Sequence, residues 1–293
     1  MGMEHYPKIA NTAFEQLSYG FHPARFDLYA LDLSRLETST RAWERIAGVL
    51  LGCSRGNFSR LPELGPLMRD NPLYLLWHAI ANISGYAGTL QTVQQTFDHI
   101  ENKSDDSFLS ILAIALGATS NISAVDYLIE AHKRVRDLEL LNEIEQEISF
   151  LLEEEDGPLM AGSVEEVLTD DGWVERANRE RYFEQVKQAR DAVLERVGSK
   201  DIPIYGGEAI DIAKIAKRMY RNLEQDEDRE QRLAREAALF EATTGINCSK
   251  MFSRNGNFRS LHAAGILEAF FDGDEIGDFK PGQRYFFGHP IGI

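Results

Sequence analysis

Apolar residues recur three and four positions apart in segment after segment of this chain, while strict two-residue alternation is scarce. Such spacing puts apolar side chains on one face of an α-helix, so the pattern predicts a mainly helical, all-α protein. We expect helices over residues 39–52, 72–84, 89–101, 105–118, 123–136, 138–154, 171–197, 208–224, 227–243 and 258–271.

Local signals support several of these helix ends. Asn71 directly precedes Pro72, which predicts a capping side chain before a first-turn proline. Asp105 and Asp106 place negative charge where the following helix has its positive dipole end. Five predicted helices follow one another over residues 71–154 with short connections, so neighbours run antiparallel. No fixed period of self-similarity is visible, and we therefore predict an irregular array of antiparallel helical hairpins.

A change of composition divides the chain near its middle. The acidic run Glu153–Asp156 is followed by Gly157 and Pro158, a combination that ends a helix. We therefore predict an N-terminal helical array over residues 1–156 and a C-terminal helical domain over residues 157–293. The run Arg284-Tyr285-Phe286-Phe287 carries too much aromatic surface to remain in water. We expect this C-terminal tail to dock on the core as an extended segment.

Charge is concentrated in one part of the sequence. The chain has 293 residues, 31 basic and 47 acidic, for a net charge of -16. Fourteen of the acidic residues lie between Asp137 and Glu175, and that window contains no Lys or Arg. A concentrated negative segment produces a local field that steers a positively charged partner and accelerates its association. A partner with a basic surface is therefore the first hypothesis.

Three glutamates of this window share one face of a predicted helix. Glu139, Glu143 and Glu147 lie at positions i, i+4 and i+8, behind an apolar stripe that includes Leu141 and Ile144. Like charges at this spacing cost roughly 0.2 to 0.5 kcal/mol per pair, and complementarity to a basic partner would offset that cost. The alternative is a solvated face whose glutamates form ion pairs with arginines of the following helix in the folded chain. Those arginines are Arg176, Arg179 and Arg181.

Two further acid clusters flank the helix and extend the predicted partner-binding surface. Trp173 lies beside them, either as a buried anchor of the interface or as a core residue. The predicted partner-binding residues are Glu139, Glu143, Glu147, Glu153, Glu154, Glu155, Asp156, Glu165, Glu166, Asp170, Asp171 and Trp173.

Sequence motifs for catalysis, cofactor binding and metal binding are missing. GxGxxG, a Walker-type loop, HExxH and GxSxG do not occur, and the seven histidines are scattered. We therefore predict no catalytic, cofactor-binding or metal site. A rival hypothesis is an enzyme whose crowded carboxylates bind a metal or act as acid and base. Those carboxylates are Glu165, Glu166, Asp170 and Asp171.

The remaining composition restricts location and partners. Cys53 and Cys248 form no CxxC pair and are expected to be buried thiols, which fits a reducing cytoplasm. The N-terminus has no signal-peptide pattern, and no run of about eighteen apolar residues occurs, so we expect a cytoplasmic protein without membrane contact. An acidic balance disfavours nucleic acid. The basic patch of residues 214–221 is expected to pair internally, with the acids of residues 226–228 or with the acidic window.

Three C-terminal runs resemble a known family. They are FEATTGINC at residues 240–248, LHAAGILE at 261–268 and PGQRYFFGH at 281–289. As a set they resemble the C-terminal part of helical, HEAT-like immunity proteins, which are encoded beside secreted bacterial toxins, including type VI effectors. The resemblance covers roughly the last fifty residues, reports a scaffold more than a chemistry, and does not identify the toxin.

The resemblance implies a protein that binds its own toxin in the cytoplasm and inhibits it without catalysis. Toxins that attack nucleic acid are usually basic, and an acidic surface can occupy or cover such a site. We therefore expect an immunity protein that neutralises a cognate secreted toxin, foremost a basic nuclease. The alternative is a non-catalytic helical scaffold or adaptor that joins protein partners. The sequence leaves open whether the chain forms a homodimer.

Overall fold

A computed structural model describes residues 36, 39–100, 105–155, 157–160, 166–168, 174–176, 179–223, 230–253 and 257–292. The described part is mainly helical, so the predicted all-α class is confirmed. The helices are α3 (Ala42–Cys53), α4 (Leu64–Asp70), α5 (Tyr74–Ala87), α6 (Leu90–Phe97), α7 (Asp106–Ala118), α8 (Ala124–Arg134), α9 (Leu138–Leu152), α10 (Arg179–Val197), α11 (Ile212–Asn222), α12 (Glu230–Thr244) and α13 (Ser260–Asp272).

Short 3₁₀ turns and strands connect these helices. The 3₁₀ turns are η2 (Leu61–Glu63), η4 (Ser249–Met251) and η5 (Asp274–Asp278). The strands form three two-stranded antiparallel hairpins: β1 (Glu166–Leu168) with β2 (Val174–Arg176), β3 (Ile204–Tyr205) with β4 (Glu208–Ala209), and β5 (Tyr285–Phe286) with β6 (His289–Pro290).

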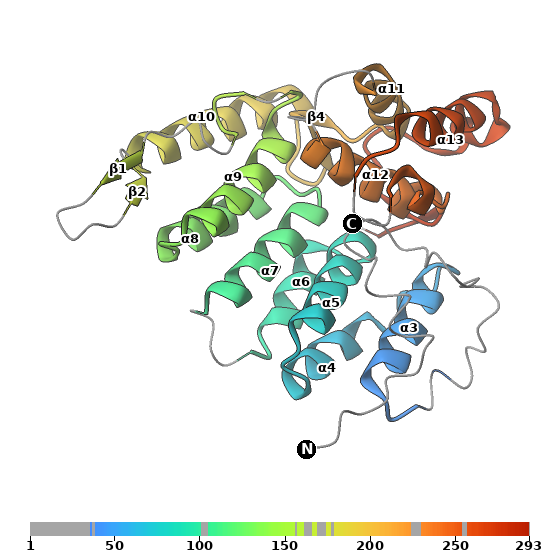
Figure 1. Cartoon of the computed structure of the whole chain (residues 1–293), viewed down its shortest axis with the longest axis horizontal. Coiled ribbons are helices and arrows are strands. Elements are labelled where there is room, and N and C mark those ends of the chain that lie inside the picture. Colours follow the sequence, from blue (N-terminus) through green and yellow to red (C-terminus); the bar gives the residue numbers. More distant parts are fainter. Residues whose placement is uncertain are drawn as a thin grey trace.

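The centre of the molecule is a stack of helices from α5 to α9. Helix α5 packs on α7 and α7 on α9, while α6 and α8 pack between them as a second row (Figure 1). The apolar positions that face inward are fully buried, among them Ile80 and Ile83 of α5, Ile111 of α7, and Ile144 and Ile148 of α9. Consecutive helices therefore bury their apolar stripes against one another, as the three- and four-residue spacing predicts. The likeness to HEAT proteins stays a prediction.

The helices that follow the predicted boundary at residue 156 pack directly on those before it. Helix α10 contacts α9, and α12 contacts α5 (Figure 1). A single cluster of buried apolar residues contains members from both sides, such as Ile148 and Leu152 before the boundary and Val186 and Phe240 after it. The structure places the two predicted parts around one shared core, and the division into two domains stays a prediction.

Two of the hairpins cap helix C-termini through their turns. Gly206 and Gly207 have φ of +64° and +72°, the values of a type I′ turn. Their N–H groups donate to the carbonyl oxygens of Phe150 and Leu151, at 2.9 Å each. The last carbonyls of a helix have no partner within the helix, so the β3–β4 turn satisfies two that α9 leaves open.

The β5–β6 turn repeats this arrangement on α12. Phe287 and Gly288 have φ of +50° and +77°. Their N–H groups donate to the carbonyl oxygens of Ala242 and Thr243, at 2.7 and 2.9 Å. Phe286 and Phe287 are buried, which confirms that the tail docks on the core. Its form differs from the prediction, because the tail folds back as a hairpin and is not a single extended segment.

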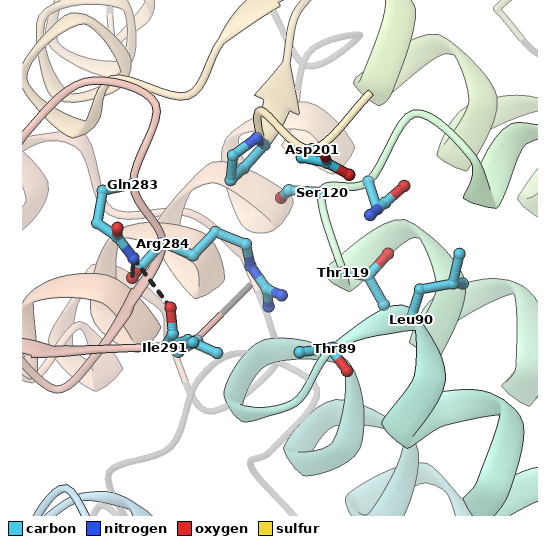
Figure 2. Close-up of a pocket in the computed structure, with 11 residues that line it drawn as sticks. Thr89, Leu90, Thr119, Ser120, Asp201, Gln283, Arg284 and Ile291 are labelled. Carbon is cyan, nitrogen blue, oxygen red and sulfur yellow. Dashed lines mark hydrogen bonds between the residues drawn. The ribbon is translucent and has the colours of Figure 1, made fainter. Parts of the chain in front are cut away.

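Arg284 fastens this tail to the ends of two central helices. Figure 2 shows its side chain reaching towards Thr119, which follows α7, and Thr89, which precedes α6. The guanidinium donates to four carbonyl oxygens at 2.6 to 3.2 Å. These belong to Gly85, Tyr86, Gly88 and Ala118. Burial lowers the pKa of Arg284 to about 10. Helix C-termini carry partial negative charge, so the arginine stabilises both ends electrostatically.

Several predicted element bounds are wrong. Strand β2 and the start of α10 at Arg179 replace the first part of the helix predicted over 171–197. Strand β4 replaces the start of the helix predicted over 208–224, because Asp211 caps α11 by accepting from the N–H groups of Ala213 and Lys214. The predicted cap at Asn71 is also wrong: its amide donates to the Leu67 carbonyl at the end of α4, which we did not predict.

Candidate functional site

The candidate site is a groove in the helical stack, which we call the acidic groove. It encloses about 470 Å³ and is lined by α5, α7, α9 and α12. Helix α9 supplies Glu139, Asn142, Glu143, Gln146, Glu147 and Phe150. The other helices supply His78, Asn82 and Tyr86 of α5, Ile114 of α7, and Ala234, Arg235 and Ala238 of α12.

Local sequence fixes how α9 faces this groove. Asp137 caps the helix, since its carboxylate accepts from the N–H groups of Glu139 and Leu140 at 2.9 and 3.1 Å. The apolar positions Leu141 and Ile144 are fully buried and hold α9 in the stack. The four-residue spacing then turns the three predicted glutamates to the groove. Glu139 and Glu143 are exposed, whereas Glu147 is only 7% exposed.

Glu147 lies at the buried end of the groove and is paired with α12. Its Oε2 accepts from Arg235 Nη2 at 2.8 Å, and Arg235 Nη1 donates to the Tyr86 hydroxyl. The guanidinium also lies over the Tyr86 ring, 5.1 Å from the centroid. Gly117 of α7 makes room for this pair, because a Cβ there would come within 1.7 Å of Glu147 Oε2. The carboxylate of Glu147 is therefore paired with Arg235 of the same chain.

Glu139 and Glu143 line the exposed part of the groove. Glu143 Oε2 accepts from the Ser110 hydroxyl at 2.5 Å, which is a neutral partner. Among the described residues no basic side chain lies within ion-pair distance of either glutamate. Arg179 is one of the arginines that were alternative partners for the glutamates, and it donates to the Val135 carbonyl at 2.8 Å. Two carboxylates one helical turn apart therefore face an open cavity, and no basic side chain in the described part of the chain pairs with them.

The protonation equilibria of the groove reflect burial. Burial raises the pKa of Glu147 to about 7, with a further rise from Glu143, against the opposing effect of Arg235. Burial also raises the pKa of Tyr86 to about 12 and lowers the pKa of His78. A cation that entered the groove would stabilise the ionised form of Glu147, so binding of a basic group and loss of a proton are linked.

Of the other predicted site residues, those that the structure describes do not line this groove. Glu153 is half-buried, and its carboxylate accepts from the Ser149 hydroxyl at 2.7 Å and from the Leu159 N–H at 3.2 Å, which is a structural role. Glu154 and Glu155 are exposed beyond the end of α9. Asp156, Glu165, Asp170, Asp171, Trp173 and the side chain of Glu166 lie outside the described residues.

Sequence reasoning missed the residues that complete the groove. Asn142 and Gln146 stand four apart beside the glutamates, so their polar face could have been read from the same periodicity. Arg235 and Tyr86 carry no such signal, because only tertiary packing brings α12 and α5 to α9. Arg235 was not among the arginines that we expected to form ion pairs with the glutamates.

The described residues were also compared with common site types. They contain no group of three or more His, Cys, Asp or Glu side chains arranged to hold a metal ion. Within the same residues, no helix combines the length and apolarity needed to cross a membrane. Cys53 and Cys248 are both buried free thiols, as predicted, and burial raises both pKa values above the ordinary range. No family model, curated protein or solved structure matches this chain significantly.

Proposed function

We propose that this chain is a non-catalytic inhibitor that binds a cognate secreted toxin with a basic surface and covers its active or substrate-binding site. The observation that carries the proposal is the pair Glu139 and Glu143, which face an open groove of about 470 Å³ without a basic partner among the described residues. Two carboxylates held so close together repel each other, and a partner's Lys or Arg side chain would relieve that repulsion.

The shape of the groove supports insertion of a side chain. Its volume lies within the range of sites that enclose a small ligand, and it is larger than one arginine side chain requires. The amide side chains of Asn82, Asn142 and Gln146 line it beside the carboxylates and make the lining polar. A guanidinium with five donors matches such a lining better than a neutral group.

An apolar surface at the start of α5 supports a protein partner. Leu73, Tyr74 and Leu75 are 44%, 50% and 57% exposed. Tyr74 stands one turn before the groove residue His78, with ring centroids 6.5 Å apart. Tyrosine is one of the residue types enriched among interface hot spots, whereas leucine is not. Tyr74 is therefore our candidate anchor, in place of Trp173, which lies outside the described residues.

The first experiment tests inhibition itself. This chain is expressed together with a secreted toxin encoded by a neighbouring open reading frame, and growth of the cells is measured. Growth should be restored by the wild-type chain and lost again with the double variant Glu139→Lys, Glu143→Lys. Cells that die in the presence of the wild-type chain would refute the proposal.

The second experiment tests the groove as the contact surface. The double variant should associate with the purified toxin about tenfold more slowly at low salt, and its rate should depend less on salt concentration. Glu195→Lys is the matched control, since Glu195 is exposed on α10 outside the groove. Equal association rates for the double variant and the wild type would move the interface away from the groove.

A helical scaffold or adaptor is the second candidate function, and the exposed run Leu73–Leu75 favours it. An adaptor holds two partners at once, whereas an inhibitor of one toxin forms a complex with a single partner. Light scattering of the purified complex measures its composition. A stable ternary complex that survives the Glu139→Lys, Glu143→Lys exchange would favour the adaptor.

A further inference from the structure

A second cavity of about 360 Å³ lies between α11 and the β3–β4 hairpin. Four basic residues of α11 line it, which we call the basic cavity. They are Lys214, Lys217, Arg218 and Arg221, spaced so that they share one helix face. The sequence predicted a basic patch at these positions but assigned it no function.

Within the described part of the chain, carboxylates form ion pairs with two of these four basic side chains. Lys214 Nζ lies 2.7 Å from Glu208 Oε2, and Arg218 Nε lies 2.7 Å from Glu236 Oε1. Lys217 and Arg221 are exposed, and no carboxylate of the described residues lies within ion-pair distance of either. Lys214 and Arg218 therefore pair internally, with other carboxylates than those predicted, and the pairing predicted for Lys217 and Arg221 stays a prediction. The predicted partners at residues 226–228 lie outside the described residues.

Two buried donors of the cavity lining also need an acceptor. The Tyr205 hydroxyl and Arg218 Nη2 are buried and have no hydrogen-bond partner among the described residues. Tyr205 is 6% exposed and Arg218 is 7% exposed, and the guanidinium lies 5.3 Å from the centroid of the Tyr205 ring. A buried donor without an acceptor costs about 1 to 3 kcal/mol, so such groups call for a specific explanation.

We propose that the basic cavity binds a small phosphate-bearing molecule with hydroxyl groups, such as a sugar phosphate or a mononucleotide. Lys217 and Arg221 neutralise the phosphate, and the donors of Tyr205 and Arg218, now buried, reach its oxygens after a rotation of the two side chains towards the cavity. Arginine and lysine are the usual phosphate ligands of proteins, and a guanidinium can bind two oxygens at once. The volume falls in the range of small-molecule sites.

The other charges around the cavity restrict the ligand further. Three carboxylates also line the cavity: Glu208 pairs with Lys214, Asp211 caps the start of α11, and Glu154 is exposed. The Glu154 carboxylate can accept a hydrogen bond from a hydroxyl but repels a second phosphate. A chain with a net charge of -16 disfavours a long nucleic acid, which needs a continuous basic surface. The lining therefore fits a compact molecule with one phosphate end and one hydroxyl-bearing end.

Calorimetric titration of the full chain tests this site with four probes: ribose 5-phosphate, AMP, inorganic phosphate and ribose. Ribose 5-phosphate and AMP should each bind at one site per chain, and ribose should not bind. Lys217→Ala and Arg221→Ala should each weaken binding about tenfold, the effect of one charged hydrogen bond. Lys187→Ala is the control, because Lys187 is an exposed lysine of α10 outside the cavity.

Tyr205→Phe separates a binding role from a structural one. This change removes only the hydroxyl without a partner, so thermal stability should stay equal or rise while binding weakens about fivefold. The absence of binding of both phosphorylated probes at about 5 mM, a concentration that detects millimolar affinity, would overturn the proposal. Equal affinity of wild type, Lys217→Ala and Arg221→Ala, or equal weakening by Lys187→Ala, would overturn it as well.

Discussion

Gly117 decides whether the charged pair at the buried end of the acidic groove can form. In Gly117→Ala the new methyl group would meet Glu147 Oε2 at 1.7 Å and Arg235 Nη2 at 3.0 Å. The pair would have to separate inside the fold, so we expect the free energy of unfolding to fall by about 2 to 4 kcal/mol. Urea unfolding followed by circular dichroism measures this change.

Gly265→Ala is the matched control for this prediction. Gly265 also lies inside a helix, α13, but a Cβ there would meet no atom within 4 Å. Alanine favours a helix by up to about 1 kcal/mol over glycine, so this variant should be equally or more stable. If Gly117→Ala behaved like Gly265→Ala, the close approach of Glu147 to α7 would be wrong.

Glu147 should make stability depend on pH. Burial and Glu143 raise its pKa from 4.5 to about 7, although Arg235 acts in the opposite direction. The folded chain then holds this proton more tightly than the unfolded chain, so the contribution of Glu147 to stability is largest below pH 4.5 and is lost as pH rises to about 7. The loss amounts to roughly 3 kcal/mol for this one group.

The measurement compares wild type with Glu147→Gln, which cannot ionise. The free energy of unfolding should fall more between pH 5 and pH 7.5 for the wild type than for the variant, because only the wild type gains a buried charge at residue 147. The remaining titratable groups that face Glu147, namely Glu143, His78, Tyr86 and Arg235, are common to both proteins. Parallel pH profiles would show that Glu147 ionises as easily in the fold as in the unfolded chain.

At the scale of elements, the two capping hairpins offer a direct comparison. Gly207 and Gly288 occupy the second turn position of β3–β4 and β5–β6, with φ of +72° and +77°. A Cβ at Gly207 would lie 2.6 Å from the Leu152 carbonyl oxygen, whereas one at Gly288 would meet nothing within 4 Å. Both Ala variants should lose about 1 to 2 kcal/mol to backbone strain.

Gly207→Ala should lose about 1 to 3 kcal/mol more than Gly288→Ala, because the turn must also move away from the end of α9. Thermal unfolding followed by circular dichroism measures both variants under one condition. Equal losses would mean that the contact of the turn with the end of α9 has little energetic weight.

Helices were predictable where a local signal marks their ends. Asp105 accepts from the N–H groups of Ser107 and Phe108, as the sequence indicated, and α7 begins at Asp106. Asn71 carried the same kind of signal, but its side chain completes α4 instead. The hairpins were missed because their strands are two or three residues long and show no alternation. The pair Gly206-Gly207 was the available sign of a tight turn.

At the scale of the whole molecule, Arg284 connects the C-terminal tail to the central stack. Arg284→Leu would leave four carbonyl oxygens at the ends of α5 and α7 without their charged donor. We expect a loss of about 3 kcal/mol or more in the free energy of unfolding. Hydrogen exchange should also accelerate at the C-terminal turns of α5 and α7, since local opening no longer breaks these contacts.

Arg41→Leu is the control, because Arg41 is 61% exposed and its ion pair with Glu44 is long, at 3.4 Å. Its loss should stay within about 0.5 kcal/mol. A similar small effect at Arg284 would mean that water replaces the guanidinium at the helix ends without cost.

The acidic groove shows how far sequence reasoning reaches. The spacing of Glu139, Glu143 and Glu147 predicted that they share a face, and all three line one cavity. Their different states could not be predicted, because Arg235, which binds Glu147, lies 88 residues further along the chain. Periodicity within one helix reports which side chains point together. It does not report which other helix will cover them.

The contact between Arg284 and Gly85 spans 199 residues, which has a consequence for synthesis on the ribosome. At 5 to 20 residues per second, the α5 carbonyls would wait roughly 10 to 40 seconds for the arginine that completes them. Until then the carbonyl oxygens at the ends of α5 and α7 lack this charged donor. The contacts at the ends of α5 and α7 can form only after Arg284 has left the ribosome, so these helices are completed long after their own synthesis.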